Sequence, residues 1–353
     1  MERNLELAAS YAFCQKIART RARNFYYSFL LLSREQRDAM CAIYAFMRYC
    51  DDISEGEGAS REGIERWRCD LDLALQGQCG DNLLWPAFHD TVQRFAIPHE
   101  YFYEMIAGVS SDLQPKQLQT FDELYRYCYQ VASVVGLTII HIFGFESPDA
   151  LALAEKCGIA FQLTNILRDV REDRENGRIY IPEEDIRKFG ADLSKHDERF
   201  VKLMSFEAQR ARAYYDESRP LIALVHARSR PSLWALIEIY RRLLSRIERS
   251  NFDVLEKRIR VPTWEKLSIL ASAALRQRWT PMWYFVPWAL GAALAFHGWQ
   301  SDRTVAEREQ TVLRTITAHE PAYHNRYRYS FSVEYYDPAD PTTNALTDFT
   351  DLE

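Results

Sequence analysis

Residues 148–176 read PDALALAEKCGIAFQLTNILRDVREDREN, and this segment gives the clearest indication of the fold. Ser147 followed by Pro148 is a helix start signal, with an N-cap residue before a proline at the first helical position. No further proline interrupts the segment, and Gly177 provides a stop signal directly after it. The segment therefore predicts one long helix whose second half is rich in charged residues.

Polar side chains follow one face of this predicted helix. Asn165, Asp169 and Asp173 occur at intervals of four residues, and Gln162 comes just before them. Carboxylates near a helix C-terminus oppose the helix dipole, and like charges four residues apart repel each other. Two interpretations account for this unfavourable arrangement: a solvated acidic face, or a set of oxygen ligands for a cation.

A second acidic cluster ends another predicted helix. The sequence SREQ at residues 33–36 has the spacing of a capping box, and apolar residues then recur every three or four positions to about residue 52. Asp51 and Glu55 share a face if the helix continues that far. Tyr44 and Arg48 lie on the same stripe.

Both clusters follow helix faces that should belong to the core, and this favours the metal interpretation. Carboxylate oxygens at the edge of a core suit Mg²⁺, for which Mn²⁺ can substitute, and leave coordination positions for water and phosphate oxygens. Arg48, Arg168 and Arg178 lie within or beside the clusters. Arginine suits bidentate contact with phosphate, although each of these residues could instead pair with a neighbouring carboxylate.

Helical periodicity dominates the remaining chain, and no run of alternating residues predicts a sheet. Further helices are expected at residues 120–145, 196–218 and 231–257 and after Pro262. The first of these opens with a capping box formed by Thr120 and Glu123. The small residues within it, Ala132, Ser133 and Gly136, either permit close helix packing or line a cavity for a hydrocarbon, and packing is the simpler interpretation.

We therefore predict an all-α protein. No internal repeat and no Pro/Gly/Ser linker divides residues 1–300, which are expected to form one domain. A C-terminal helix is expected at residues 301–319. Residues 320–353 are rich in Tyr, Asp, Thr and Pro without a sustained period and predict a poorly ordered tail.

The composition limits the function. The 353-residue chain has a formal charge of −6 and no local Lys/Arg block, which argues against nucleic-acid binding. Its seven cysteines are scattered without CxxC pairs, and the N-terminus lacks the apolar stretch of a secretory signal, so a cytoplasmic location is expected. The apolar segment 282–296 predicts either a buried helix or a patch that attaches the protein to the cytoplasmic membrane surface.

The chain resembles the squalene/phytoene synthases, which join two prenyl diphosphates head to head. The resemblance covers roughly residues 10–270 and is carried by NFYYSFLLL (24–32), YAFMRYCDDISE (44–55), YCYQVASVVG (127–136), QLTNILRDVRED (162–173) and GRIYIP (177–182). It implies a single isoprenoid-synthase helical bundle around a central hydrophobic cavity. It also implies that two acidic motifs face each other across the cavity mouth, with Mg²⁺ between them and the substrate diphosphates.

Individual positions acquire roles through this resemblance. The metal ligands would be Asp51, Glu55, Asn165, Asp169 and Asp173. The substrate-binding residues would be Arg48, Gln162, Asn165, Arg168 and Tyr180. The catalytic residues would be Tyr44 and Tyr127, near the reacting carbons, and Arg48. Glu55 departs from the family pattern, which usually has Asp there, so the metal geometry at this position is open.

The resemblance also implies a reaction. One donor ionises to an allylic cation, the double bond of the second prenyl chain attacks it, and loss of a proton gives a cyclopropylcarbinyl diphosphate. Tyr127 or a diphosphate oxygen would assist the proton transfer. The motifs look closest to presqualene diphosphate synthases of hopanoid pathways, which use two farnesyl diphosphates. Continuation to squalene would require a reductant such as NADPH, and the chain has no GxGxxG motif after a strand.

Two alternatives remain from the sequence. The first is a phytoene synthase, which uses two geranylgeranyl diphosphates. The second is a non-catalytic subunit that binds prenyl lipids, against which the clustered carboxylates argue. In each case the expected partners are prenyl diphosphates, a membrane surface and downstream isoprenoid enzymes.

Overall fold

The computed structural model describes residues 2–21, 28–54, 60–113, 116–277, 331–335 and 345–349. The chain divides into two compact units, Met1–Pro281 and Met282–Glu353. The described part of the first unit has only helices as its regular elements. In chain order these are α1 (Glu2–Arg21), α3 (Arg34–Ser54), α4 (Arg61–Leu75), α5 (Trp85–Arg94), α6 (Glu100–Ser111), α7 (Phe121–Cys128), the π-helical turn η1 (Tyr129–Ser133), α8 (Val134–Phe143), α9 (Asp149–Glu175), α10 (Glu183–Phe189), α11 (Glu198–Glu217), α12 (Leu221–Leu224), α13 (Arg230–Arg249) and α14 (Thr263–Gln277).

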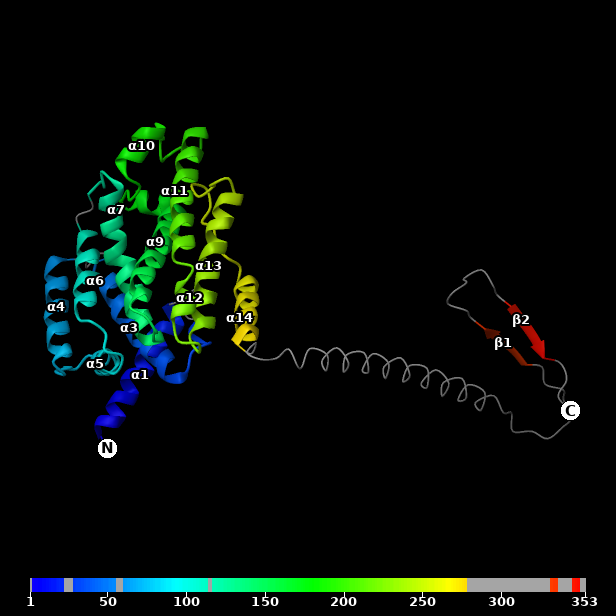
Figure 1. Ribbon diagram of the computed structural model, residues 1–353, viewed down its shortest axis with the longest axis horizontal. Coiled ribbons are helices and arrows are strands. Elements are labelled where there is room, and N and C mark those ends of the chain that lie inside the picture. Colours follow the sequence, from blue (N-terminus) through cyan, green and yellow to red (C-terminus); the bar gives the residue numbers. More distant parts are fainter. Residues whose placement is uncertain are drawn as a thin grey trace. The chain divides into compact units, whose positions relative to one another are not determined.

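The predicted helix starts at Ser33 and Thr120 are confirmed because their capping bonds are local, whereas at the third predicted start Pro148 is the N-cap residue and the helix begins at Asp149. The backbone N–H of Gln36 donates to Oγ of Ser33 at 3.3 Å, and that of Glu123 donates to Oγ1 of Thr120 at 3.4 Å. The long helix expected after Ser147 is α9. Figure 1 shows α9 in the middle of the bundle, with α6 and α7 on one side and α11 and α13 on the other.

Two predicted helices differ from the structure. The helix expected at residues 120–145 is interrupted by η1, which separates α7 from α8. The helix expected at residues 231–257 ends at Arg249 instead. Asn251 and Phe252 follow it with left-handed backbone angles, φ 54° and 60°, which an α-helix cannot accommodate.

An aromatic cluster holds α3 against its neighbours. The ring of Phe46 on α3 lies 4.8 Å from that of Phe88 on α5 and 5.4 Å from that of Phe102 on α6. It also stacks on Trp67 of α4 at 5.7 Å. Such contacts add to the burial of large apolar surfaces. They fix the C-terminal half of α3, which carries the first acidic motif.

Small residues bring η1 and α8 close to α9. A Cβ atom at Gly158 of α9 would lie only 2.5 Å from Cα of Ser133. The hydroxyl of Ser133 donates to the carbonyl of Glu155 at 2.8 Å, and a Cβ at Gly136 would lie 3.2 Å from the carbonyl oxygen of Ala154. At Ser133 and Gly136, therefore, the small side chains serve close helix packing.

The described part of the second unit is a pair of antiparallel strands, β1 (Phe331–Tyr335) and β2 (Ala345–Phe349). Their register pairs Phe331 with Phe349 and Tyr335 with Ala345. The sequence pattern did not indicate these strands, because alternation over five residues is too short to recognise. The apolar segment 282–296 and the helix expected at 301–319 lie outside the described residues. Among the described helices, none combines the length and hydropathy needed to cross a bilayer.

Candidate active site

Most of the predicted site residues line one cavity of about 360 Å³ between α3, α6, η1 and α9. Those present in its wall are Arg48, Asp51, Tyr127, Gln162, Asn165, Arg168, Asp169, Asp173 and Tyr180. Its apolar lining consists of Met47, Met105, Val109, Val131, Val135 and Ile166. We call this space the reaction cavity. The fold thus brings together motifs that are more than a hundred residues apart in the chain.

Two predicted residues are not part of this wall. Tyr44 is half-buried on α3, one turn before Arg48, and it does not line the reaction cavity. Burial raises the pKa of its phenol, while the charge of Arg48 acts in the opposite direction. Glu55 lies outside the described residues, as do residues 24–27 of the first matching motif.

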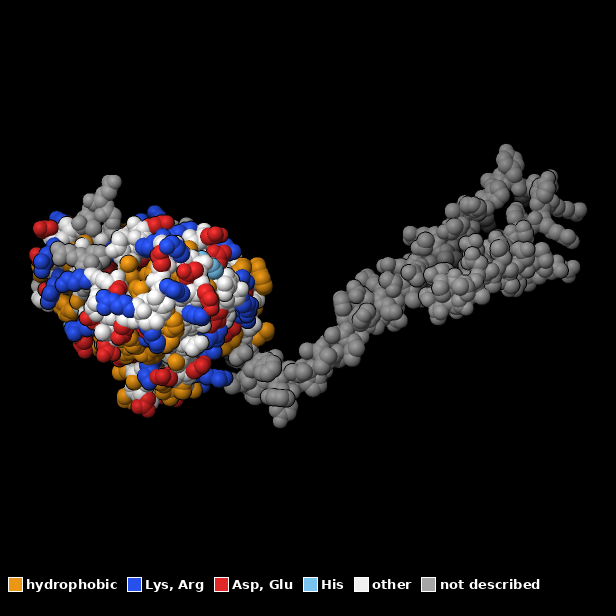
Figure 2. Space-filling model, turned by 90° about the horizontal axis from the view of Figure 1, so that it is seen from above, with side chains coloured by type: hydrophobic (Ala, Val, Ile, Leu, Met, Phe, Trp, Pro, Cys, Tyr) orange, Lys and Arg blue, Asp and Glu red, His pale blue; other side chains and the backbone are white. Residues whose placement is uncertain are grey.

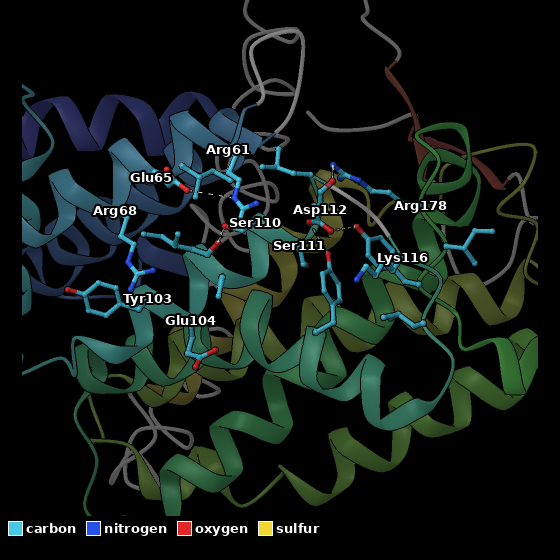
Figure 3. Close-up of a pocket in the computed structure, with 18 residues that line it drawn as sticks. Arg61, Glu65, Arg68, Tyr103, Glu104, Ser110, Ser111, Asp112, Lys116 and Arg178 are labelled. Carbon is cyan, nitrogen blue, oxygen red and sulfur yellow. Dashed lines mark hydrogen bonds and ion pairs between the residues drawn. The ribbon is translucent and has the colours of Figure 1, made fainter.

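Two further cavities adjoin the reaction cavity. The first, of about 750 Å³, shares Asp112, Tyr127, Arg178 and Tyr180 with it. Figure 3 shows Arg178 and Asp112 toward one end of this side cavity and Arg68 toward the other. The second, of about 780 Å³, meets the reaction cavity at Arg168 and is called here the basic cavity. The cationic residues in its lining are Arg19, Arg168, Arg258, Arg260 and Lys266.

Asp169 is held between two arginines. Nε of Arg168 donates to its Oδ1 at 2.8 Å, and the guanidinium also bonds the second carboxylate oxygen. Nη2 of Arg258 lies 3.0 Å from Oδ1, and Nε of the same arginine lies 3.2 Å from Glu172. Burial would raise the pKa of Asp169, but the hydrogen bonds and charge of Arg168, together with the charge of Arg258, hold it below its ordinary value. Asp169 is therefore an ionised carboxylate.

Asp173 has a different environment one turn further along α9. Burial and then the negative charge of Asp169 raise its pKa to about 7, although Arg178 acts in the opposite direction. A buried carboxylate beside another carboxylate ionises more readily when a cation lies between them. The two aspartates thus favour a bound cation.

Asn165 supports the same conclusion. Its Oδ1 is buried and has no hydrogen-bond partner within the described part of the chain, while its amide nitrogen donates to Gln162 at 3.3 Å. A buried acceptor without a partner is unfavourable unless a ligand completes it. Asp51 lines the cavity from α3. The donor set of Asn165, Asp51, Asp169 and Asp173 therefore fits a hard cation.

The carboxylates do not form a closed metal cage. Among the described residues, no three His, Cys, Asp or Glu side chains come close enough together to hold a metal ion by themselves. Mg²⁺ usually takes only one or two protein carboxylates and completes its shell with water and phosphate oxygens. The donor set therefore suits a cation that binds together with a phosphate-bearing ligand.

Arg48 lies beside the first acidic motif and is engaged by it. Its guanidinium bonds Asp52 and lies 4.0 Å from Oδ2 of Asp51. Asp52 also pairs with Arg21 at 3.1 Å. Nε of Arg48 is buried without a partner among the described residues. In this structure Arg48 pairs with neighbouring carboxylates. The contact of Arg48 with a diphosphate remains a prediction.

Asp112, which sequence reasoning missed, joins the two predicted tyrosines. The hydroxyl of Tyr127 donates to its Oδ2 at 3.2 Å, and that of Tyr180 donates to its Oδ1 at 3.0 Å. The two rings stack with centroids 4.7 Å apart, and Nη2 of Arg178 donates to the Asp112 carbonyl at 3.4 Å. Asp112 lies just after α6, outside any recognisable motif, so no signal in the sequence identified it.

Tyr127 is a proton-bearing group at neutral pH. Burial, followed by the charge of Asp112, raises the pKa of its phenol well above the ordinary value. Burial and Asp112 likewise raise the pKa of Tyr180. Both phenols therefore act as hydrogen-bond donors in the wall between the reaction cavity and the side cavity.

Positive and negative side chains are mixed on the face of the molecule that Figure 2 shows. With a formal charge of −6, the chain as a whole does not attract anions. An anionic ligand would instead be held locally, by the arginines and the cation that the carboxylates favour.

Comparisons with known proteins agree with these features. The family model described as squalene/phytoene synthase matches residues 6–265. The chain is 38% identical over 294 residues to a phytoene synthase of Arthrospira platensis, covering 76% of this chain and 94% of that protein. It is 36% identical over 290 residues to a 15-cis-phytoene synthase of Synechococcus elongatus, with the same coverage.

Solved structures of two related enzymes share the fold of this chain. A dehydrosqualene synthase crystallised with a ligand superposes with a TM-score of 0.73 at 29% identity, covering 78% of this chain and 99% of that chain. The squalene synthase HpnC of Alicyclobacillus acidocaldarius superposes with a TM-score of 0.66 at 26% identity, covering 70% and 96%. Together with the family match over residues 6–265, these similarities establish that the chain belongs to the squalene/phytoene synthase family.

Proposed function

We propose that this chain is a phytoene synthase, which condenses two molecules of geranylgeranyl diphosphate head to head. The observation that carries the proposal is its 34–38% identity to phytoene synthases of cyanobacteria and plants, including those of Arthrospira platensis and Arabidopsis thaliana. The motifs alone led us to prefer the farnesyl reaction that gives presqualene diphosphate. The relatives favour the alternative, and we adopt it here.

The geometry supports a reaction between two diphosphates. The reaction cavity holds the carboxylates of both acidic motifs, and the basic cavity begins on the other side of Arg168. Five cationic side chains line the basic cavity, whereas none of its lining residues is acidic. Two anionic head groups therefore have separate surroundings that meet at one arginine, as the joining of two prenyl diphosphates requires.

The cation in this proposal is Mg²⁺, with Mn²⁺ as a substitute. Asp51, Asn165, Asp169 and Asp173 would hold it together with diphosphate oxygens and water. A bound Mg²⁺ would neutralise charge on the leaving diphosphate. Arg168, which already bonds Asp169, would add a bidentate donor to the same head group.

The protein side chains would perform the remaining tasks. The apolar lining of the reaction cavity would exclude water from the allylic cation. Tyr127 and Tyr180 remain protonated and donate to Asp112, so this triad would shape the cavity wall beside the diphosphate. For the proton that leaves the coupled product, a diphosphate oxygen is the better acceptor, because a protonated phenol is a poor base.

A farnesyl-based reaction is the second candidate. It is favoured by the structural similarity to a dehydrosqualene synthase and to a squalene synthase. In this case the product would be presqualene diphosphate or, with NADPH, squalene. A non-catalytic prenyl-lipid-binding subunit is a weaker candidate, because the carboxylates, the arginines and the unpartnered Asn165 oxygen all remain in place.

The test is a product assay. Purified full-length protein is incubated with Mg²⁺ and either geranylgeranyl or farnesyl diphosphate, with and without NADPH, and products are identified by mass spectrometry after phosphatase treatment. Phytoene from geranylgeranyl diphosphate is the expected result. Presqualene alcohol or squalene from farnesyl diphosphate, with no product from geranylgeranyl diphosphate, would reject the proposal in favour of the farnesyl reaction. The absence of any product while substrate still binds would favour the non-catalytic subunit.

A further inference from the structure

The side cavity leads from the reaction cavity to the surface of the molecule. Its inner end is the wall that both cavities share, which consists of Asp112, Tyr127, Arg178 and Tyr180. Its outer end lies between α4 and α6, where Arg68 is exposed. Figure 3 shows Arg178 and Arg68 toward these opposite ends. A small ligand that leaves the reaction cavity past the two tyrosines therefore enters a space that opens to solvent.

Cationic side chains line this space along its length. At the inner end, Nη2 of Arg178 donates to the carbonyl of Asp112 at 3.4 Å, and Lys116 follows Asp112 by four residues. On α4, Arg61 and Arg68 share one face, because they are seven residues, or about two helical turns, apart. An anion that moves outward would therefore pass from one pair of cations to a second pair.

Lys116 and Arg68 are exposed and have no carboxylate partner within the part of the chain that the structure describes. The guanidinium of Arg68 instead lies over the ring of Tyr103, 5.6 Å from its centroid. Arg61 is held only loosely, because its Nε lies 3.7 Å from Glu65 and both side chains are largely exposed. These three cations can turn toward an anion without breaking a strong ion pair.

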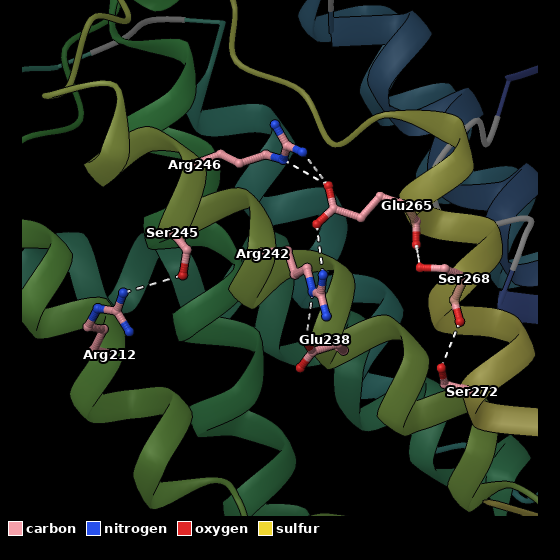
Figure 4. Close-up of polar contacts among 8 residues, drawn as sticks. All are labelled: Arg212, Glu238, Arg242, Ser245, Arg246, Glu265, Ser268 and Ser272. Carbon is pink, nitrogen blue, oxygen red and sulfur yellow. Dashed lines mark hydrogen bonds and ion pairs between the residues drawn. The ribbon is translucent and has the colours of Figure 1, made fainter. Parts of the chain in front are cut away.

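Another arginine pair on the molecule shows the contrast. Arg242 and Arg246 of α13 donate to one carboxylate, that of Glu265, at 2.9 Å and 3.0 Å (Figure 4). Glu265 is only 6% exposed, so this carboxylate neutralises the arginines from inside the fold. An added anion would compete with a buried partner there, whereas at Lys116 and Arg68 it would replace solvent.

Acidic side chains also line the side cavity, and they keep the attraction weak. Glu104 accepts from Nε2 of Gln130 at 2.9 Å, and Asp112 accepts from the two tyrosines. Together with Glu65, these residues give the lining a formal charge of +1, from four cations and three carboxylates. A passage for an ion needs this balance, because binding must favour entry and still permit departure.

We propose that the side cavity binds inorganic diphosphate on its way out of the reaction cavity. This inference rests on the proposed condensation, in which the C–O bond of each prenyl diphosphate breaks and its electron pair leaves with the diphosphate. Two prenyl diphosphates thus give one hydrocarbon, two diphosphate anions and two protons, which can leave on those anions. Each anion must depart from a cavity with an apolar wall, and cations along the exit stabilise it.

The head group of an entering substrate has the same chemistry as inorganic diphosphate. Its hydrocarbon chain, however, would have to pass Arg61, Glu65 and Arg68, whose charged groups are exposed to water. A prenyl chain gains little hydrophobic burial beside solvated charges, so this route suits the anion without its chain.

The first experiment locates the anion on the full-length wild-type protein, without prenyl substrate. Lysines are acylated with an amine-reactive reagent in EDTA, at increasing concentrations of sodium diphosphate, and the modified fraction of each lysine is measured by peptide mass spectrometry. Without Mg²⁺, the cation-dependent site of the reaction cavity stays empty. Lys116 is the reporter, and Lys16, which is exposed on α1 outside the side cavity, is the control.

Diphosphate should protect Lys116 about tenfold at roughly 10 mM, as expected for a dissociation constant of about 1 mM. The modification of Lys16 should not change, and sodium sulfate at the same ionic strength should have little effect. Equal protection by sulfate, or no protection of Lys116, would overturn the proposal. Protection by an unreactive prenyl thiodiphosphate at lower concentrations than by diphosphate would assign the cavity to substrate entry and also overturn it.

The second experiment measures the exit itself in a single turnover. Rapid quenching gives the rate of hydrocarbon formation, and excess pyrophosphatase with a phosphate sensor gives the rate at which diphosphate reaches solution. The test variant combines Arg68→Gln and Lys116→Gln. The matched control combines Arg66→Gln and Lys16→Gln, which remove the same charges from exposed positions outside the side cavity. Exposed substitutions of this kind usually change stability little.

We expect the test variant to release diphosphate about three- to tenfold more slowly, with hydrocarbon formation as in the wild type and the control. Release at the wild-type rate would overturn the proposed exit. Slower hydrocarbon formation would place the two cations in the chemistry and would also overturn it. If no protein forms a hydrocarbon, the proposed condensation fails, and the protection of Lys116 still decides whether the cavity binds diphosphate.

Discussion

The hydroxyls of Tyr127 and Tyr180 meet at a single carboxylate, that of Asp112, at 3.2 Å and 3.0 Å, while their rings stack 4.7 Å apart. One residue comes from the end of α7, one from the segment after α9, and the carboxylate from the chain after α6. This triad forms the wall between the reaction cavity and the side cavity. Its geometry therefore fixes where two proton donors point.

Replacing the carboxylate should disturb one of the two donors. In Asp112→Asn, the amide nitrogen cannot accept a hydrogen bond, so one of the two phenol O–H groups loses its acceptor. We expect kcat to fall by roughly 10- to 100-fold and the free energy of unfolding to fall by about 1–2 kcal/mol. Steady-state kinetics and urea unfolding measure the two effects. Asp72→Asn is the control, because Asp72 also accepts from a tyrosine, Tyr103, outside the reaction cavity. Wild-type turnover in Asp112→Asn would show that the triad has only a structural role.

Tyr127→Phe tests the phenol itself. The substitution keeps the ring that stacks on Tyr180 and removes only the hydroxyl. We expect kcat to fall by about tenfold or more while thermal stability changes little. Unchanged turnover would remove Tyr127 from the chemistry and leave the stacking as its function.

Asp169→Asn should abolish the cation site. The variant removes the ionised carboxylate that Arg168 and Arg258 hold, so the arginines would face a neutral group. We expect kcat/KM to fall by about 10³-fold or more and Mg²⁺-dependent binding of inorganic diphosphate, measured by calorimetry, to be lost. Glu175→Gln is the control on the same helix, because Glu175 is largely exposed and pairs only loosely with Arg171. Diphosphate binding that survives in Asp169→Asn would assign the cation to other ligands.

The stability of the protein should depend on Glu207 above pH 5. Burial, followed by the charge of Asp185, raises the pKa of Glu207 to about 7, although Arg210 bonds both carboxylates. A folded-state pKa above the ordinary value of 4.5 stabilises the fold below that value, and the stabilisation is lost as the pH rises through about 7. In Glu207→Gln this loss should be absent.

The measurement compares the free energy of unfolding of the two proteins by urea between about pH 5 and pH 8. The stability of Glu207→Gln relative to the wild type should rise with pH by on the order of 2 kcal/mol. Asp173, whose pKa is also raised, is present in both proteins and cancels in the difference. Parallel pH profiles would show that Glu207 does not titrate in this range.

Gly158→Ala should destabilise the bundle more than Gly136→Ala. A Cβ atom at Gly158 would lie 2.5 Å from backbone Cα of Ser133, so α9 and η1 would have to move apart. At Gly136 the nearest atom, a carbonyl oxygen, is 3.2 Å away and needs to yield only slightly. We expect a loss of about 2–3 kcal/mol for Gly158→Ala and less than half of that for Gly136→Ala. Equal losses would mean that the contact with η1 is not rigid.

The helices were predictable where their signals are local. Ser33 and Thr120 cap helices through bonds to residues three positions away, and the row Asn165, Asp169 and Asp173 lies on one face of a helix whatever surrounds it. The fold brings the family motifs together, and most of the predicted site residues line one cavity.

Other features depend on contacts between distant segments and could not be read from the sequence. Asp112 acquires its role from tyrosines 15 and 68 residues away. The end of α13 was missed because the left-handed residues after it are not glycines. The interruption at η1 was missed because residues 134–143 are almost uniformly apolar and give no helical phase.

The π-helical turn η1 also sets the angular alignment of the cavity wall. In a continuous α-helix, residues eight positions apart differ by about 80° around the axis, whereas an extra residue in a π turn reduces this offset to about 20°. Tyr127 and Val135 lie on either side of η1 and both line the reaction cavity. Loss of one residue from Tyr129–Ser133 would therefore rotate one side of this wall by about a quarter turn relative to the other.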